Sequence, residues 1–402
     1  PVERLAALRH EFGEHGGVNM SIEASTTFTV MEAGTMPEIF QGRLGPDDGG
    51  CFLYGRHFNP TVYVLGRQLA ALEGAEAGYC TGSGLGAISC ALLGLLNKGD
   101  HVVAADTLYG GTWAMLAEFF PQKCGIETTF VDINDRDAVA AACKDNTRVV
   151  YAESLSNPTL RVTNLPMIAE VAHARGAKLV VDNTFTPLCI SPHQLGADVV
   201  LHSLTKFING SSDTMGGVIC GTQEFIDTLC NVNDGASMLL GASMDSLRAS
   251  SILKNLRTLH IRIKQHSKNA MYLAQKFEAD GIRTVYPGLK THPSHELFNK
   301  MMNDEYGYGG MLTIDAGNLE NANRLMELMQ QRNVGYLAVS LGFYKTLFSA
   351  PASSTSSEIP IEEQVKMGLT DGLIRFSIGL DNDIKRTYQI IHQCMLEVGV
   401  LK

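Results

Sequence analysis

The stretch KLVVDNTFTPLCISPHQLGADVVLHSLTKF, residues 178–207, contains two short apolar runs, each followed by polar side chains. Residues 178–183 and 198–203 are predicted strands, because β-branched runs of this length are typical of sheets buried on both faces. The polar residues at their carboxyl ends are Asp182, Ser203, Thr205 and Lys206. Taken alone, such an Asp is often a turn or helix cap, and such a Lys is usually solvated. In parallel sheets, however, ligands bind at the carboxyl ends of strands, so this stretch predicts a ligand site.

Similar short runs occur on both sides of this stretch. Strands are predicted at 77–81, 101–105, 128–132, 148–153 and 217–221. Helices are predicted between several of them: an amphipathic one over 64–74 ending at Gly74, a buried one over 84–99 closed by Gly99, and one over 164–176. Alternating strands and helices predict an α/β fold with a mostly parallel sheet covered by helices on both faces.

The pattern changes after the long helical segment 247–281, and the strands become sparser. They are predicted at 309–317, 335–340 and 373–380. We therefore predict three parts: an irregular N-terminal arm over 1–55, an α/β domain over 56–257 and a smaller C-terminal α+β domain over 258–402. One continuous helix across the last boundary is compatible with the pattern.

Composition limits the classes of function. The 402 residues include 42 acidic residues against 32 Lys and Arg, a formal charge of −10. This balance argues against a nucleic-acid partner, because phosphate binding needs clustered basic residues. The longest apolar run, from Gly84 to Leu96, is shorter than the roughly 20 residues that span a bilayer, so no membrane partner is predicted. With 45% hydrophobic and 18% charged residues, the chain is predicted to be globular.

The nine cysteines are scattered, and none forms a CxxC pair. We therefore expect reduced core thiols in a cytoplasmic protein rather than a disulfide framework. His292 and His295 lie three residues apart without an evident third ligand, so no metal site is predicted. The chain begins at Pro1, which leaves open whether a targeting segment precedes it.

The segment Gly82-Ser83-Gly84-Leu85-Gly86-Ala87 follows a predicted strand and opens a helix. Backbone N–H groups in such a turn can hold an anion, and the helix dipole strengthens the binding. The segment also fits the fingerprint GxGxxG/A of NAD-dependent dehydrogenases. That fingerprint is weak here, because only Asp100 and Asp106 approach the place where it needs an acidic residue.

Lys206, Asp182 and this anion-binding turn together favour pyridoxal phosphate (PLP) chemistry. A Lys can form the Schiff base with the cofactor, and an Asp can pair with the pyridinium nitrogen and keep it protonated. The helix N-terminus and neighbouring hydroxyls can take the phosphate.

The sequence resembles the Cys/Met-metabolism family of PLP enzymes, also called the trans-sulfuration family, from about Tyr54 to Leu380. The motifs that carry the resemblance are YGRHFNPT (54–61), LEG-EA (72–77), TGSGLGA (81–87), LYGGT (108–112), ESLSNPT (153–159), VDNTF (181–185), SLTKF (203–207), YPGLKTHPSHEL (286–297), YGYGGM (306–311), AVSLG (338–342) and LIRFSIGLD (373–381). The resemblance implies the fold type I of aspartate aminotransferase.

The resemblance also implies roles for individual residues. Lys206 would bind the cofactor covalently, Asp182 would pair with its ring nitrogen, and Tyr109 would stack on the ring and assist proton transfer. Phosphate contacts are implied for Gly84, Leu85, Ser203 and Thr205, and for Tyr54 and Arg56 from a neighbouring subunit. Arg375 would bind the substrate carboxylate, with Ser340 beside it, which agrees with the planar fork of an arginine. A homodimer with shared active sites is thus expected, within a tetramer.

The sequence departs from the pattern of the family at Leu204, at Gly111, at Ser211, where His or Gln is common, and in the segment 351–358, which lacks a Met-Thr-His run. Leu204 stands where the family usually has a small residue, and Gly111 stands where bacterial methionine γ-lyases typically carry Cys. These departures leave the predicted cofactor site intact and bear on the substrate side.

The expected reaction is the γ-elimination of L-methionine to methanethiol, ammonia and 2-oxobutanoate. Val339 favours it, since the cystathionine enzymes of this family commonly carry Glu before the residue equivalent to Ser340. The alternatives within the family are a cystathionine γ-lyase and an O-acylhomoserine sulfhydrylase. Outside it, an NAD-dependent dehydrogenase and a non-catalytic cofactor-binding protein stay open.

Overall fold

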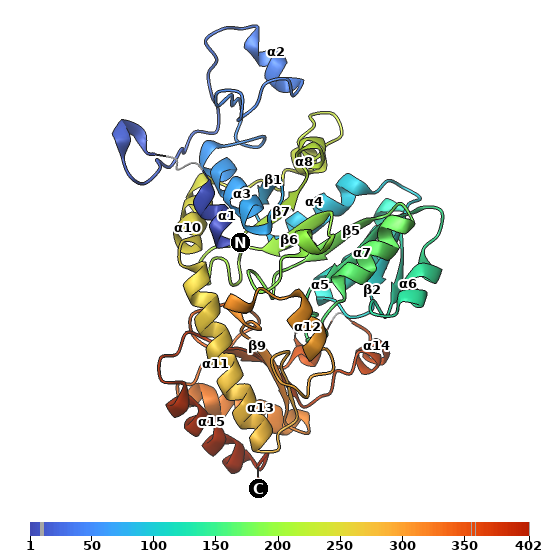
Figure 1. Ribbon diagram of the computed structural model, residues 1–402, viewed down its shortest axis with the longest axis vertical. Helices are drawn as coiled ribbons and strands as arrows, with labels where there is room; N and C mark the ends of the chain where they lie inside the picture. The colour runs from blue at the N-terminus through green and yellow to red at the C-terminus, as the bar shows by residue number, and fades with distance from the viewer. Residues whose placement is uncertain (9–11, 355, 358, 402) are drawn as a thin grey trace.

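The computed structural model describes residues 1–8, 12–354, 356–357 and 359–401. It contains a larger sheet in the N-terminal half and a smaller one in the C-terminal half, and the long helix α11 (Leu259–Ala279) runs from the level of one to the other (Figure 1). The α/β class predicted from the sequence is confirmed. Among the described residues, no helix is both long and apolar enough to cross a membrane.

The larger sheet has the order β1-β7-β6-β5-β4-β2-β3. Strands β6, β5, β4, β2 and β3 are parallel, whereas β7 is antiparallel to both of its neighbours. The strands are β1 (Ala77–Thr81), β2 (His101–Ala105), β3 (Glu127–Val131), β4 (Thr147–Glu153), β5 (Lys178–Asp182), β6 (Val199–Ser203) and β7 (Gly217–Gly221). The apolar residues of β2, β4, β5 and β6 are buried, which explains their continuous β-branched runs.

Helices cover both faces of this sheet. Asn59 caps α3 (Pro60–Glu73) by accepting from the N–H groups of Thr61 and Val62, and Gly74 ends the helix at φ 79°. The helices of this half are α3, α4 (Gly84–Leu95), α5 (Gly110–Ala114), α6 (Arg136–Ala142), α7 (Leu165–Ala174), α8 (Gln223–Leu229), α9 (Ala236–Leu240) and α10 (Ser246–Leu256), with a π-helical segment at Met115–Cys124 and a 3₁₀ turn at Pro192–Leu195. The packing of α3 on β1 and β7 and of α4 on β6 and β7 fixes the strand ends that carry polar residues.

Two predicted helix boundaries were wrong. Helix α4 ends at Leu95 rather than at Gly99, because Leu96 is extended and buries its side chain in the core before a tight turn that the Asp100 carboxylate closes on the N–H of Asn97. The predicted helical segment 247–281 contains two helices, since α10 ends at Leu256 and α11 begins at Leu259.

The smaller sheet has the order β10-β11-β12-β9-β8 and packs against α11 and α13, which in turn contact α15. Its strands are β8 (Thr284–Val285), β9 (Met311–Asp315), β10 (Tyr336–Leu337), β11 (Leu347–Ser349) and β12 (Leu373–Ser377). The helices of this half are α11, α12 (His295–Met301), α13 (Leu319–Gln331), α14 (Ile361–Lys366) and α15 (Ile384–Val398), with 3₁₀ turns at Asp304–Tyr306 and Pro351–Ser353. Only Tyr336–Leu337 of the predicted strand 335–340 is strand, and Ser340, which follows it, contacts Lys206 after β6.

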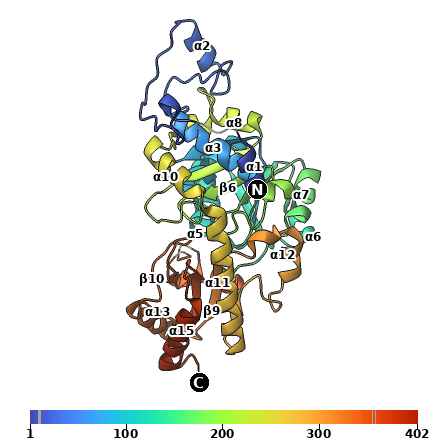
Figure 2. The same ribbon diagram turned by 60° about the vertical axis from the view of Figure 1, so that its left-hand side comes forward.

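The N-terminal arm is mostly irregular, as predicted. It contains α1 (Val2–Ala7), α2 (Thr35–Phe40) and a 3₁₀ turn at Glu14–Gly16. The segment with α2 projects beyond the larger sheet, which both views show (Figures 1 and 2). Its exposed apolar side chains include Met31, Met36 and Phe40.

Candidate active site

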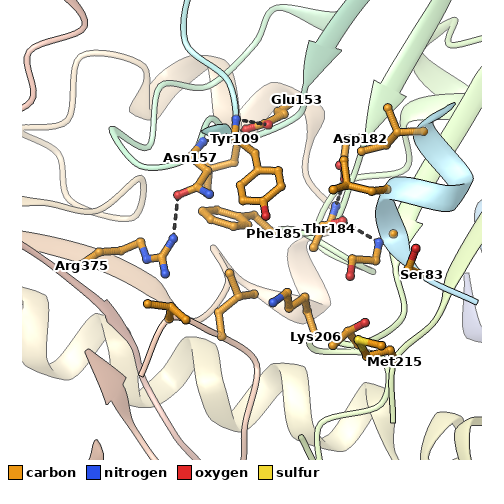
Figure 3. A pocket seen from close by; sticks show the side chains of 18 residues that line it. Ser83, Tyr109, Glu153, Asn157, Asp182, Thr184, Phe185, Lys206, Met215 and Arg375 are labelled. Carbon is orange, nitrogen blue, oxygen red and sulfur yellow. Dashed lines mark hydrogen bonds between the residues drawn. The ribbon is translucent and has the colours of Figure 1, made fainter. Parts of the chain in front are cut away.

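A cavity of about 260 Å³ lies where the carboxyl ends of β4, β5 and β6 face the smaller sheet (Figure 3). Parallel strands bring their carboxyl ends to one edge, so residues far apart in the sequence meet there. The lining residues are Ser83, Gly84, Leu85, Ile88, Tyr109, Glu153, Leu155, Asn157, Asp182, Thr184, Phe185, Ser203, Thr205, Lys206, Met215, Val339, Leu341 and Arg375.

Lys206 extends into the cavity from the turn after β6. Its Nζ donates a hydrogen bond of 3.2 Å to the hydroxyl of Ser340. Burial, together with the nearby charge of Arg375, lowers the pKa of Lys206 to about 8. A larger fraction of the amine is therefore unprotonated and nucleophilic near neutral pH than in an exposed lysine.

Two carboxyl groups, of the buried Glu153 and the half-buried Asp182, lie side by side at the ends of β4 and β5, where these residues are register partners. Asp182 accepts a hydrogen bond of 2.9 Å from the N–H of Thr184. Burial raises the pKa of Asp182, against the opposing effects of Thr184 and of the charge of His202. Burial and the charge of Asp182 likewise raise the pKa of Glu153. A cationic group at Asp182 would favour its ionised form.

The turn before α4 forms a cradle for an anion. Ser83 caps the helix by accepting from the N–H of Gly86 at 3.0 Å. A Cβ on Gly84 would lie 2.8 Å from the Cβ of Ser203, so only glycine allows this close approach of helix and strand. Beside them, Thr205 Oγ1 accepts from the N–H of Gly216 at 3.1 Å. Backbone N–H groups and two hydroxyls thus surround the helix N-terminus.

The same glycine-rich turn does not have the surroundings of a dinucleotide site. Strand β1, which precedes it, is an edge strand antiparallel to β7. The dinucleotide fingerprint instead requires a βαβ unit of parallel strands. This finding argues against the dehydrogenase alternative.

Tyr109 immediately precedes α5 and lines the cavity. Its backbone N–H donates to Glu153 Oε1 at 2.7 Å, which fixes the start of the helix to the end of β4. A Cβ on Gly111 would lie 2.8 Å from Cε1 of the Tyr109 ring. The absence of a side chain at Gly111 therefore determines where this ring can lie.

Arg375 reaches the cavity from β12 of the smaller sheet and is only 2% exposed. Its Nη1 donates to Asn157 Oδ1 at 2.7 Å and its Nη2 to Ser349 Oγ at 3.4 Å. Among the residues that the structure describes, no carboxylate forms an ion pair with it. Burial lowers its pKa to about 10, which leaves it cationic at neutral pH. A buried guanidinium with neutral partners is suited to an incoming carboxylate.

The mouth of the cavity is formed by the segment after β10. Val339 lines the cavity and is 64% exposed, and Ser340 follows it within reach of Lys206. Leu204, the departure noted between Ser203 and Thr205, is fully buried and does not line the cavity.

Tyr54 and Arg56 do not line the cavity of their own chain. The Arg56 guanidinium lies 5.5 Å from the centroid of the Tyr54 ring and donates to the carbonyl of Met238 at 2.9 Å. A single chain thus brings together all of the predicted site residues except Tyr54 and Arg56.

Sequence reasoning missed several residues at the site. Glu153 and Asn157 belong to the quoted motif ESLSNPT. The motif was recognised in the sequence, but no role was predicted for these two residues. Thr184, whose hydroxyl accepts from the N–H of Ser203, lies in VDNTF. The other lining residues that it missed are Ile88, Leu155, Phe185, Met215 and Leu341.

These features fit PLP. A half-buried lysine of lowered pKa, a carboxylate at a strand end, an exposed aromatic ring and a glycine-requiring anion cradle surround one cavity. Fold and site together define a PLP-dependent enzyme of the aspartate aminotransferase type.

The sequence matches the family described as Cys/Met metabolism PLP-dependent enzyme over residues 5–386. The chain belongs to this family. It is 48% identical over 400 residues to a protein named methionine gamma-lyase from Arabidopsis thaliana, with 99% of this chain and 90% of the relative covered. It is 38% identical over 333 residues to a cystathionine gamma-lyase from Bacillus subtilis, with 82% and 85% covered.

A solved structure from Campylobacter jejuni is similar throughout. It is of a protein assigned as an O-acetylhomoserine (thiol)-lyase and contains N'-pyridoxyl-lysine-5'-monophosphate. The TM-score is 0.89 at 30% identity, with 98% of this chain and 99% of that chain covered. The predictions of the family, the fold and the cofactor are thus confirmed.

Proposed function

We propose that this chain is a carbon–sulfur lyase that converts L-methionine and water to methanethiol, ammonia and 2-oxobutanoate. The observation that carries the proposal is the apolar Val339, 64% exposed at the mouth of a cavity that also contains Lys206 and Arg375. An apolar side chain there is suited to the S-methyl group of methionine and offers nothing to a charged distal group. The 48% identity to a relative named methionine gamma-lyase supports the same choice.

Cofactor binding is proposed for the residues of the larger sheet. Lys206 would hold PLP covalently and Asp182 would keep its ring nitrogen protonated, while the Tyr109 ring would stack on it. The phosphate would lie at the N-terminus of α4, between Gly84, Leu85, Ser203 and Thr205. When bound, PLP supplies an electron sink for negative charge that develops on the substrate.

Substrate binding and proton transfer are proposed for three side chains. Arg375, held by Asn157 and Ser349, would bind the substrate carboxylate through both of its terminal nitrogens. The Lys206 amine, with its lowered pKa, would accept the Cα proton of the substrate and hold it for return. Tyr109 would supply a proton to the departing thiol. Ser340 would orient the Lys206 amine through the hydrogen bond that they form.

A shared active site is proposed for the assembled protein. Tyr54 and Arg56 lie outside their own cavity, so they are available to a neighbouring subunit, with the arm 1–55 contributing to the contact. We propose a homodimer with shared sites within a homotetramer, located in the cytoplasm. The parts 56–257 and 258–402 are proposed as the cofactor domain and the C-terminal domain.

Parallel assays of four substrates test the proposal. Methionine, cystathionine, homocysteine and O-acetylhomoserine are incubated with the purified holoenzyme, and 2-oxobutanoate and volatile thiol are measured. We expect methionine to yield 2-oxobutanoate and methanethiol in equal amounts. Preference for cystathionine would make the protein a cystathionine γ-lyase, and thiol-dependent replacement on O-acetylhomoserine without elimination would make it a sulfhydrylase. No turnover of any of the four would indicate a non-catalytic cofactor-binding protein.

A further inference from the structure

A buried acidic and a buried imidazole side chain lie behind the cofactor site, and the mechanism above uses neither. Glu73 is the last residue of α3, and His202 is the penultimate residue of β6. Glu73 Oε1 lies 2.7 Å from His202 Nε2, and their side chains are 3% and 1% exposed. Because the carboxylate only accepts, the imidazole must carry hydrogen on Nε2.

The pair lies on the face of the sheet opposite to the cavity. Side chains alternate along a strand, so His202 and the cavity-lining Ser203 point to opposite faces. The same holds at the end of β5 for Asn183 and the cavity-lining Asp182. Asn183 Nδ2 donates to Glu73 Oε1 at 3.3 Å, so one carboxylate contacts the residues adjoining both Asp182 and Ser203.

The Asn183 side chain is itself held in place. Its Nδ2 also donates to the carbonyl of Ile190, and its Oδ1 accepts from the hydroxyls of Ser154 and Thr186 at 2.8 and 2.7 Å. The backbone N–H of Asn183 donates to the carbonyl of Leu201 on β6. Glu73 thus closes a hydrogen-bonded cluster that joins the ends of β5 and β6 on the α3 side.

This cluster has a cost for folding. Glu73 Oε2 and His202 Nδ1 are buried and have no hydrogen-bond partner among the described residues. A buried ion pair with unsatisfied atoms is a poor source of stability compared with apolar packing. Buried polar atoms without hydrogen-bond partners are found mainly at functional sites in natural proteins.

Electrostatics connects the pair to the cavity. The charge of His202 lowers the pKa of Asp182, opposing the effect of burial. The other titratable groups near the pair and near Asp182 are Glu153 on β4, Tyr151 on β4 and Cys220 on β7. Burial raises the pKa of Tyr151 and of Cys220 well above their ordinary values, so both are neutral near pH 7. The charge of His202 therefore acts on Asp182 from the opposite face of the sheet.

We propose that Glu73 and His202 form a buried hydrogen-bonded pair that acts as a positioning element for PLP, holding the ends of β5 and β6 in register behind Asp182 and Ser203. Glu73 fixes the position of His202 through their hydrogen bond, and the charge of His202 favours the ionised form of Asp182. The inference rests on the cofactor site proposed above and is independent of which amino acid is the substrate.

The test compares four variants as apoproteins: Glu73→Gln, the double variant Glu73→Gln/His202→Gln, Asp182→Asn and His101→Gln. The double variant retains a hydrogen bond between two neutral amides, so it removes the charge of the pair with little change of shape. It replaces Glu73→Gln in the comparison if that single variant does not fold. His101 is a fully buried histidine of β2, bonded to Thr129 and Thr147 at the other end of the sheet, and is the matched control. Thermal unfolding verifies that each variant is folded.

Each folded variant is titrated with PLP, and the absorbance of the bound cofactor is then followed against pH. We expect Glu73→Gln and the double variant to raise the apparent Kd for PLP at least about tenfold, and His101→Gln to leave it within about twofold. In Glu73→Gln and in the double variant, the pH midpoint of the absorbance change of bound PLP should shift in the same direction as in Asp182→Asn. The shift should be smaller than in Asp182→Asn.

A folded double variant with native affinity and native pH midpoint, beside an altered Asp182→Asn, would overturn the inference and leave the cofactor site standing. If Asp182→Asn also matches the native protein, the assignment of Asp182 is wrong and the inference falls with it. Neither result depends on turnover of methionine, so failure of the proposed reaction is distinguishable from both.

Discussion

The Nζ of Lys206 lies 3.2 Å from the hydroxyl of Ser340, and this hydrogen bond connects the two sheets. Lys206 follows β6 of the larger sheet, whereas Ser340 follows β10 of the smaller one. The contact places the proposed cofactor lysine beside the segment that carries Val339. The residue proposed for substrate choice therefore lies near the residue proposed for proton transfer, although Lys206 and Ser340 are 134 residues apart in the sequence.

Replacement of Lys206 by Ala should abolish elimination even when PLP stays bound. The reason is that Lys206 is proposed both to hold the cofactor and to move the substrate proton. Borohydride reduction of the native protein followed by peptide mapping should place the cofactor on Lys206. Finding it on any other lysine would refute the assignment.

The stability of the apoprotein should depend on pH through Lys206. Its pKa is about 8 in the folded chain against an ordinary value of 10.5, so the unfolded state binds more protons between these values. The resulting destabilisation is fully present below about pH 8 and is relieved as the pH rises toward 10.5.

The variant Lys206→Met removes this group and should therefore unfold less readily at pH 7, by on the order of 1–3 kcal/mol. Denaturant unfolding of both apoproteins at several pH values measures the difference. A difference that is constant from pH 7 to pH 10.5 would contradict the lowered pKa.

Arg375→Lys should raise KM for the amino acid substrate and lower kcat/KM by at least about tenfold, because an ammonium cannot form the paired bonds of a guanidinium. Cofactor absorbance should be unchanged. Arg136→Lys, at an exposed arginine that pairs with Glu170, is the control and should have native kinetics. Unchanged KM in Arg375→Lys would show that the substrate carboxylate binds elsewhere.

Arg56→Ala should weaken PLP binding, because an Arg–phosphate pair in a partly buried site contributes roughly 1.5–3 kcal/mol. Mixing Arg56→Ala chains with Lys206→Ala chains should restore part of the activity, since hybrid dimers contain one site with both native residues. Absence of recovery in hybrids verified by mass would count against a shared site.

Val339→Glu should shift preference from methionine toward cystathionine. A carboxylate at this position can pair with the distal ammonium of cystathionine, but beside the methyl thioether it is a desolvated charge without a partner. Val339→Leu is the matched control and should keep the native order of substrates. If Val339→Glu leaves the ratio of kcat/KM for methionine to that for cystathionine unchanged, Val339 does not determine the preference and no longer supports the assignment.

The fold and most of the candidate site could be predicted because the polar residues of the site directly follow predicted strands, within short motifs. Asp182, Ser203 and Lys206 lie within one stretch of 30 residues, and the parallel sheet places their strands side by side. Arg375 lies in β12 of the smaller sheet and Val339 in the segment after β10, and only the family resemblance connected them to this edge.

Other features depend on tertiary packing that no local pattern contains. The end of α4 at Leu95 is set by the burial of Leu96, and the short β8 and β11 become strands only by pairing with longer ones. The contact between Glu73 and His202 spans 129 residues, so the motif that contains Glu73 and the stretch that contains His202 do not predict it.

The ratio of kcat/KM for methionine to that for cystathionine in the unmodified holoenzyme tests the central claim most directly. The exposed Val339 predicts that methionine is preferred by at least roughly tenfold, with methanethiol and 2-oxobutanoate formed together. A preference for cystathionine would contradict the proposed function and assign the protein to cystathionine cleavage.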